Sequence, residues 1–165
     1  RAATIQQAAE SLKLANPLDI VKRCHTIMQE VKDLEKERDA LQAEITNLKT
    51  KSLFDNPYEV NGVKVVTAML TNTRPDMGDE LKAREADAVA VVAGVDGEKA
   101  NLVVVCGKNA VAKGAHAGKI AGKVAALTGG KGGGRPDSAM AGIGDRFKID
   151  EALDKVNEIV GEFVK

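Results

Sequence analysis

Aromatic residues are scarce in this sequence, which has one tyrosine, three phenylalanines and no tryptophan among its 165 residues. RNA-recognition motifs and OB-folds bind nucleic acid by stacking bases on clustered aromatic side chains. So few aromatic residues can hardly build such a platform. The sequence therefore predicts that any contact with RNA depends on phosphates and shape, with little discrimination between base sequences.

Cysteine is also scarce, since only Cys24 and Cys106 are present. They form no Cys-x-x-Cys pair, which argues against a zinc site and a disulfide scaffold and fits a reducing cytoplasm. We expect both to be small buried side chains. The two histidines, His25 and His116, fall in different segments, and no Ser, His and Asp group stands out. The sequence thus predicts no catalytic or metal site and no bound cofactor.

Long hydrophobic runs are missing as well, because no apolar stretch approaches the roughly 20 residues that cross a bilayer. Residues 1–14 have the pattern of a polar amphipathic helix rather than of a signal peptide. The chain has no initiator methionine, which indicates a piece of a longer protein. Its 44% hydrophobic and 29% charged residues are typical of folded domains, and its length fits a small domain with an appendage.

Acidic residues are absent from one segment, Lys99 to Pro136, although the whole chain has a net charge of zero. The segment holds seven basic residues: Lys99, Lys108, Lys113, Lys119, Lys123, Lys131 and Arg135. A basic segment within a neutral chain produces a focused positive field, which is typical of proteins that bind phosphate-bearing partners.

The first third of the sequence predicts a helical coiled-coil arm over residues 1–50. A short helix ends before Asn16-Pro17, and a second helix of about 50 Å runs over residues 18–49. Two positions of a heptad repeat form an apolar seam: Ile20, Ile27, Leu34, Leu41 and Leu48 at one, and Cys24, Val31, Arg38 and Ile45 at the other. The pattern favours pairing with another helix, as in a helical hairpin, over packing on the chain's own domain.

The remainder predicts a linker over residues 51–57 and a compact α/β domain over residues 58–165, with a small mixed or antiparallel sheet. Asn61-Gly62 indicates a β-hairpin whose second strand continues to Leu70. Two apolar runs, 88–95 and 102–106, indicate a buried antiparallel pair. Helices are predicted after Pro75 over 76–87, over 110–127 and over 150–164, with a short extended piece at 138–142.

A glycine-rich loop, Gly129 to Gly134, is the most informative local feature. It lacks the Gly-Lys-Ser/Thr ending of a Walker A loop, and it does not follow the GxGxxG pattern, so ATP and NAD binding are disfavoured. Glycines allow backbone N–H groups to approach a phosphate closely, and they also serve packing alone. The neighbouring Lys131 and Arg135 favour phosphate contact.

The predicted helix before the loop has two distinct faces. Its basic edge holds His116, Lys119 and Lys123. Its small-residue face, with Gly118 and Gly122 four residues apart, permits close packing against a sheet or another helix. A solvated row of lysines remains an alternative interpretation of the basic edge.

Three segments together resemble the end of bacterial alanyl-tRNA synthetases: Lys113-Gly114-Ala115-His116-Ala117-Gly118, then Gly129 to Asp137, then Ala141-Gly142. In that family the loop usually has a glycine run followed by Arg-Pro-Asp-Met-Ala-Gln-Ala-Gly-Gly. The helical arm and the strands match in order, so the resemblance covers essentially the whole chain. This sequence departs from the family pattern at Ser138, Met140 and Ile143.

The resemblance implies a C-terminal domain that binds the elbow of alanine tRNA and helps couple aminoacylation with editing. It implies that the other domains of the synthetase are partners, that ATP and zinc belong to those domains, and that the arm supports homodimers in some members. We expect the RNA-binding residues to lie on one side of the domain: Lys108, Lys113, His116, Lys119, Lys123, Lys131, Gly132, Gly133, Gly134 and Arg135.

Two alternatives belong to other functional classes. The first is the substrate-binding half of a DHH-type oligonucleotide phosphoesterase, against which the Gly-Arg-Pro-Asp ending argues, since such enzymes have a Gly-His ending. The second is a purely structural coiled-coil dimerisation module, which would not bind RNA at physiological salt. Neither the catalytic Asp-His-His motif of the first class nor any nucleophile stands out in the chain.

Overall fold

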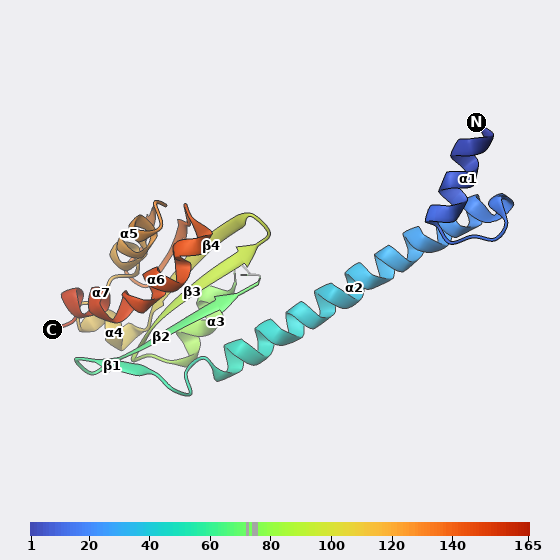
Figure 1. Ribbon diagram of the computed structural model, residues 1–165. Coiled ribbons are helices and arrows are strands. Elements are labelled where there is room, and N and C mark those ends of the chain that lie inside the picture. Colours follow the sequence, from blue (N-terminus) through green and yellow to red (C-terminus); the bar gives the residue numbers. More distant parts are fainter. Residues whose placement is uncertain (72, 74–75) are drawn as a thin grey trace. The chain divides into compact units, whose positions relative to one another are not determined.

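A computed structural model describes residues 1–71, 73 and 76–165. The chain divides into two compact units, a helical unit, Arg1–Gln42, and a globular unit, Ala43–Lys165 (Figure 1). Among the described residues, no helix combines the length and the apolar character that crossing a membrane requires.

The helical unit contains α1 (Ala2–Ser11), the short helix η1 (Pro17–Asp19) and most of α2 (Ile20–Ser52). The predicted break between the two helices is present, because the side chain of Asn16 accepts a hydrogen bond from the backbone N–H of Leu18 at 3.1 Å and Pro17 follows as the first helical residue. Helix α2 continues to Ser52, two residues into the range predicted as a linker.

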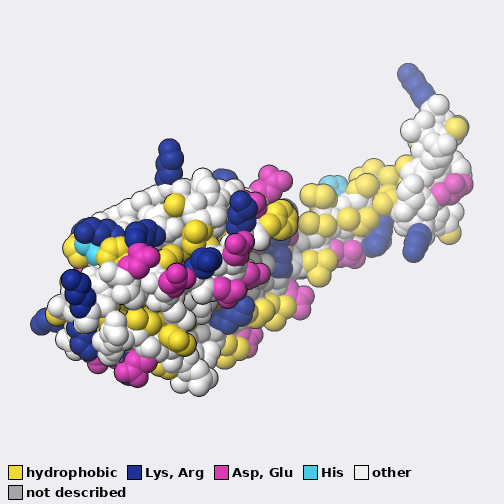
Figure 2. Space-filling model, turned by 60° about the vertical axis from the view of Figure 1, so that its left-hand side comes forward, with side chains coloured by type: hydrophobic (Ala, Val, Ile, Leu, Met, Phe, Trp, Pro, Cys, Tyr) yellow, Lys and Arg dark blue, Asp and Glu magenta, His cyan; other side chains and the backbone are white. Residues whose placement is uncertain are grey.

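The apolar seam of α2 is exposed. Leu34 and Leu41 are 63% and 52% exposed, so within residues 1–42 the seam lacks the helix-to-helix pairing that the heptad pattern predicts. Figure 2 shows hydrophobic side chains gathered along the helical unit. Cys24 is exposed on the same helix, so the prediction that it is buried is wrong, because a single helix without a partner leaves its seam in solvent.

The globular unit is built on one six-stranded sheet in the order β1-β2-β3-β4-β6-β5. The strands are β1 (Tyr58–Val60), β2 (Val63–Leu70), β3 (Ala88–Asp96), β4 (Lys99–Cys106), β5 (Gly132–Gly134) and β6 (Ser138–Gly142). Strands β2 and β3 are parallel and every other neighbouring pair is antiparallel, which confirms the predicted mixed sheet in an α/β domain.

The two predicted hairpins form for reasons visible in the sequence. Asn61 and Gly62 both have positive φ, 49° and 82°, which is the backbone that a tight two-residue turn between β1 and β2 requires. Strand β3 is buried from Ala88 to Gly94 on both faces, because it lies inside the sheet between β2 and β4. That position explains its continuous apolar run.

Helices cover both faces of the sheet (Figure 1). On one face, α3 (Met77–Arg84) packs with Leu53 and Phe54 over alternate residues of β2, β3 and β4. The other face carries the larger core, which α4 (Lys108–Ala112), α5 (Ala117–Leu127), α6 (Ile149–Asp154) and α7 (Val156–Phe163) cover. Cys106 is buried in this core, as predicted, and burial raises the pKa of its thiol to about 12.

Three predicted elements are shorter or different in the structure. The helix predicted over 110–127 is two helices, because Gly114 has a φ of 107° and packs so closely on the carbonyl of Phe163 that a side chain would overlap it. The helix predicted over 150–164 is interrupted at Lys155. The end of the glycine-rich loop is strand β5 rather than irregular chain. Pro75, the predicted start signal of the third helix, lies outside the described residues.

Candidate nucleic-acid interface

Strand β5 consists of three glycines at the edge of the sheet, and these have two different surroundings. A Cβ atom on Gly134 would lie 2.7 Å from the Cα of Ala139, and one on Gly132 would overlap Ala141. Both positions therefore exclude any side chain for reasons of packing. A Cβ on Gly133 would meet nothing within 4 Å, and its φ is not positive, so neither space nor backbone strain requires a glycine there.

Helix α5 packs closely against β5 through its small-residue face. Gly118 touches the carbonyl of Gly134 so closely that a Cβ atom would overlap it, and a Cβ on Gly122 would lie 3.4 Å from the carbonyl oxygen of Gly132. This confirms the predicted close packing of the Gly118 and Gly122 face. The glycines of α5 thus allow the helix to approach β5, whereas Gly132 and Gly134 of β5 lack side chains because β6 approaches them.

The first backbone donors of α5 already have partners within the chain. The N–H groups of Ala117 and Gly118 donate to the carbonyl oxygens of Pro136 and Arg135, at 2.8 and 3.1 Å. The N–H of Lys119 donates to Nδ1 of His116 at 3.2 Å. His116 therefore caps this helix, and its start offers no free N–H cluster of the kind that binds phosphates.

The side chains next to the glycines lie on the face of the sheet away from α5. Gly132 and Gly134 face α5, because their neighbours in β6 pack with α5 in the larger core. Alternation along the chain then places Lys131, Gly133 and Arg135 on the opposite face of the sheet. We call this exposed surface of Lys131, Gly133 and Arg135 the glycine strip. Met140, the partner of Gly133 in the register, extends it and is 50% exposed.

A salt-bridge network holds one end of the glycine strip against α3. Asp137 accepts a hydrogen bond from Nζ of Lys82 at 2.8 Å, and its other oxygen lies 3.4 Å from Nε of Arg135. The hydrogen bond from Lys82, together with the charges of Lys82 and Arg135, lowers the pKa of Asp137 below its ordinary value although some desolvation opposes this. Lys82 is thus a cation beside the strip that sequence reasoning missed, because it precedes the basic segment.

The predicted site residues come from elements on both faces of the sheet. Lys131, Gly133 and Arg135 lie on the same side of the sheet as α3, whereas His116, Lys119 and Lys123 belong to α5 on the other side. Because β5 is the edge strand and α5 packs directly on it, the prediction that these residues share one side of the domain stays a prediction.

Two of the predicted lysines also have structural partners. Lys113 donates to the carbonyl oxygen of Gly62 at 2.9 Å and supports the turn between β1 and β2. Lys123 pairs with Glu162 and lies 5.1 Å from the centre of the Phe163 ring. In the part of the chain that the structure describes, Lys108, Lys119 and Lys131 are exposed and form no ion pair.

The charges of the globular unit are mixed over much of its surface. On the face that Figure 2 shows, Lys and Arg side chains gather at the left-hand end, and Asp and Glu side chains lie beside them. Residues 1–71, 73 and 76–165 contain no group of three or more His, Cys, Asp or Glu side chains that could hold a metal ion.

Comparison with known proteins gives one family and relatives of one kind. The DHHA1 domain family matches residues 62–162. An alanine–tRNA ligase from Bacillus thuringiensis (strain Al Hakam) is 38% identical over 160 residues, 94% of this chain, and one from Clostridioides difficile (strain 630) is 36% identical over 151 residues, 89% of this chain. The chain spans only 18% and 17% of the length of these two relatives.

One solved structure matches with a similar fold. It is the crystal structure of the C-Ala domain from Aquifex aeolicus alanyl-tRNA synthetase, with 25% sequence identity and a TM-score of 0.57. The match covers 64% of this chain and 98% of that domain. The resemblance to the C-terminal part of alanyl-tRNA synthetases that the sequence indicated is therefore confirmed.

Proposed function

The chain belongs to the DHHA1 domain family, and we propose that it is the C-terminal, tRNA-binding region of an alanine–tRNA ligase. It binds the elbow of alanine tRNA and helps the aminoacylation and editing sites of the parent enzyme to use one bound tRNA. Its partners are this tRNA and the other domains of the synthetase, in the cytoplasm. ATP and zinc are bound by those other domains, and this region alone catalyses no reaction.

The glycine strip is the observation that supports RNA binding most directly. It presents a flat backbone at Gly133 between two exposed cations, Lys131 and Arg135, at the edge of the sheet. RNA phosphates and riboses can approach such a surface without displacing a side chain. Gly133 needs no glycine for packing or for its φ, so the approach of a ligand would account for the lack of a side chain there.

The experiment that tests this surface compares charge removal on the two sides of the sheet. A Lys131→Ala/Arg135→Ala variant should bind intact tRNA more weakly and reduce the slope of log affinity against log salt by roughly one to two units. A Lys155→Ala/Lys165→Ala variant removes the same charge from exposed positions elsewhere and should leave the slope unchanged. Equal behaviour of the two variants would mean that the glycine strip does not bind RNA.

The lysines of α5 are tested separately, because they lie on the other side of the sheet. A Lys119→Ala/Lys123→Ala variant that matches the loss seen for Lys131→Ala/Arg135→Ala would indicate that RNA contacts both sides. A smaller loss is expected, since Lys123 is already paired with Glu162.

Gly133 gives a test that separates binding from folding. Gly133→Val places a side chain in open space, so it should leave the melting temperature unchanged while it weakens tRNA binding. Wild-type affinity of Gly133→Val would show that nothing approaches this backbone.

The elbow is tested with two RNAs. Intact alanine tRNA should compete for the chain much better than a minihelix that contains only the acceptor stem. Equal competition would assign the contact to the acceptor stem. Deleting residues 58–165 from the parent enzyme should then weaken aminoacylation and editing together, because both sites would lose the same tRNA contact.

We also propose that the arm mediates a homodimer through the exposed seam of α2. The aliphatic residues of the seam at 34, 41, 45 and 48 are about half exposed or more, which leaves an apolar stripe that a second helix would cover. Sedimentation at several concentrations tests this proposal, and a chain that remains monomeric at the highest concentration would contradict it.

A further inference from the structure

The three phenylalanines of the chain differ sharply in their surroundings. Each has a cationic side chain about 5.1 Å from its ring centre: Arg84 at Phe54, Lys123 at Phe163 and Arg146 at Phe147. Phe54 and Phe163 also pack against the two buried cores. Phe147 packs against neither and is 83% exposed, in a sequence that has few aromatic side chains.

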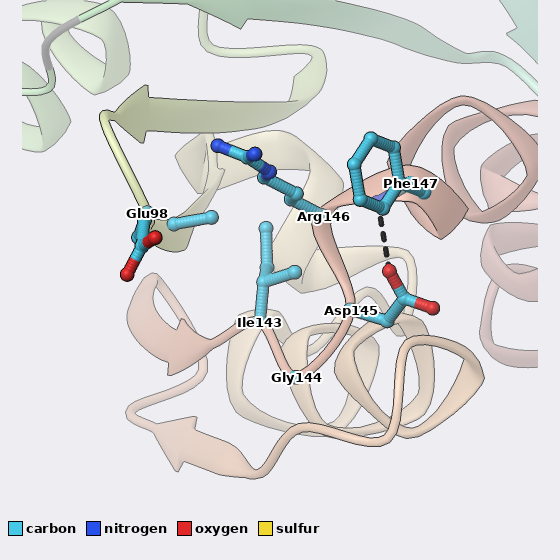
Figure 3. A pocket seen from close by; sticks show the side chains of 7 residues that line it. Glu98, Ile143, Gly144, Asp145, Arg146 and Phe147 are labelled. Carbon is cyan, nitrogen blue, oxygen red and sulfur yellow. Dashed lines mark hydrogen bonds between the residues drawn. The ribbon is translucent and has the colours of Figure 1, made fainter.

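Phe147 is exposed although its backbone is well anchored. It lies in the short helix η2 (Arg146–Lys148), where Oδ1 of Asp145 accepts a hydrogen bond from its N–H at 2.9 Å (Figure 3). The N–H of Asp145 in turn donates to the carbonyl oxygen of Thr128 at 2.7 Å. The ring is therefore presented to solvent by a fixed turn rather than by a loose end of the chain.

An open pocket of about 280 Å³ lies beside the Phe147 ring, with Ile143 and Ala100 in its wall (Figure 3). Arg146 is the cation of this pocket, and its Nη1 already donates to the carbonyl oxygen of Gly97 at 2.7 Å. Glu98 and Asp145 line the same pocket. This pocket disfavours a phosphate, because it has two carboxylates and its only named cation is already hydrogen-bonded to the backbone. It suits an uncharged planar group that carries hydrogen-bond donors.

The backbone of Lys131 lies close to the pocket, whose Ala100 and Ile143 pack against the larger core on the α5 side of the sheet. The carbonyl oxygen of Lys131 accepts a hydrogen bond from the N–H of Gly142 at 2.8 Å, and Ile143 of the pocket is the next residue. A nucleotide strand that crosses the edge of the sheet at Lys131 would therefore pass close to the pocket.

We propose that Phe147 and the adjoining pocket bind one unpaired nucleobase that carries an exocyclic amine. The base stacks on the exposed ring, and the amine donates to the carboxylate of Glu98. This inference rests on the proposed RNA binding at the glycine strip, and it adds a contact that depends on stacking rather than on charge.

A tryptophan substitution gives a direct signal for stacking. The chain has no tryptophan, so Phe147→Trp introduces a single fluorophore at the site. Its emission should be quenched by a hexamer of adenosine and less by a hexamer of uridine, because uracil has no exocyclic amine. Adding Glu98→Gln should reduce this difference between the two hexamers. Equal spectra with and without both hexamers at saturating concentration would overturn the proposal.

Affinity for intact tRNA tests the same site without a reporter. Phe147→Ala should weaken binding about fivefold or more and leave the salt slope unchanged, since the lost contact is not electrostatic. Phe147→Trp should restore the affinity. Tyr58→Ala, which removes an aromatic side chain that is 60% exposed on β1, is the matched control and should bind as the wild type does.

The two proposals fail in different ways. A wild-type chain that does not bind tRNA contradicts the proposed function. A wild-type chain that binds tRNA, together with a Phe147→Ala variant of equal affinity and an unquenched Phe147→Trp variant, overturns only the nucleobase site.

Discussion

The helical unit and the globular unit use apolar residues in opposite ways. In the helical unit, Leu34 and Leu41 repeat at heptad spacing and remain more than half exposed. In the globular unit, the apolar residues of β3 and β4 are buried in two cores that helices of the same unit cover. The difference indicates that the globular sequence specifies its own packing partners, whereas the partner of the seam is not in the unit that carries it.

The largest effect is expected where helix and strand approach most closely. Gly118→Val would place a branched side chain on the backbone of Gly134, so α5 and β5 could no longer pack together. We expect a loss of several kcal/mol of unfolding free energy, or failure of the globular unit to fold. Hydrogen exchange should rise in β4, β5 and β6 while residues 1–42 exchange as in the wild type.

Gly133→Ala is the matched control for Gly118→Val, because its added methyl group points into open space. It should melt like the wild type. If Gly118→Val also melted like the wild type, the close contact between α5 and β5 would not be part of the fold in solution.

The next prediction compares the loss of unfolding free energy when one core residue and one seam residue are each replaced by alanine. Ile120 of α5 is fully buried, so Ile120→Ala should lower the unfolding free energy by about 2–5 kcal/mol at every protein concentration. Leu34→Ala should change it by less than about 0.5 kcal/mol in dilute solution, where the seam is exposed. At concentrations at which a homodimer forms, the cost of Leu34→Ala should rise toward a few kcal/mol.

Thermal melts at two concentrations a hundredfold apart measure this difference. A Leu34→Ala cost that is already large in dilute solution would show that the seam is covered within one chain. A negligible cost at both concentrations would contradict the homodimer and leave the seam to another domain of the parent enzyme.

Local sequence signals predicted those elements that local chemistry determines. Asn61-Gly62 identifies the first hairpin because both residues adopt positive φ, and the apolar run of β3 identifies a central strand because both its faces are buried. The heptad pattern identifies α2 because period and length are properties of the helix itself. The resemblance then matched these elements in order and supplied the expected function, which periodicity alone does not give.

Other features depend on contacts between distant segments and were not predictable from local patterns. Strand β5 is made of glycine, which has a low strand propensity, and it exists because α5 and β6 pack closely against it. The break before α5 depends on the carbonyl of Phe163, which lies about fifty residues later in the sequence. Lys82 joins the edge of the candidate site through Asp137, and nothing in the basic segment indicates it.

The smallest effect is expected at the salt bridge between α3 and the turn after β5. Lys82 and the Arg135 guanidinium lower the pKa of Asp137 in the folded chain, so its charged form stabilises the fold at pH values above the ordinary range of aspartate. This contribution is lost as the pH falls through the lowered pKa, below about 4. Because Asp137 is partly exposed, it amounts to at most about 1 kcal/mol.

Asp137→Asn measures that contribution, because asparagine keeps the size and one acceptor oxygen but removes the charge. The variant should be slightly less stable than the wild type at pH 7 in dilute salt, and the difference should shrink in high salt and disappear near pH 2. Glu30→Gln in the helical unit provides the comparison, since its salt bridge with Arg23 is exposed and its loss should change stability still less. A difference for Asp137→Asn that persists unchanged at pH 2 would show that the side chain acts through its shape and hydrogen bonds, and that the turn is not held to α3 by charge.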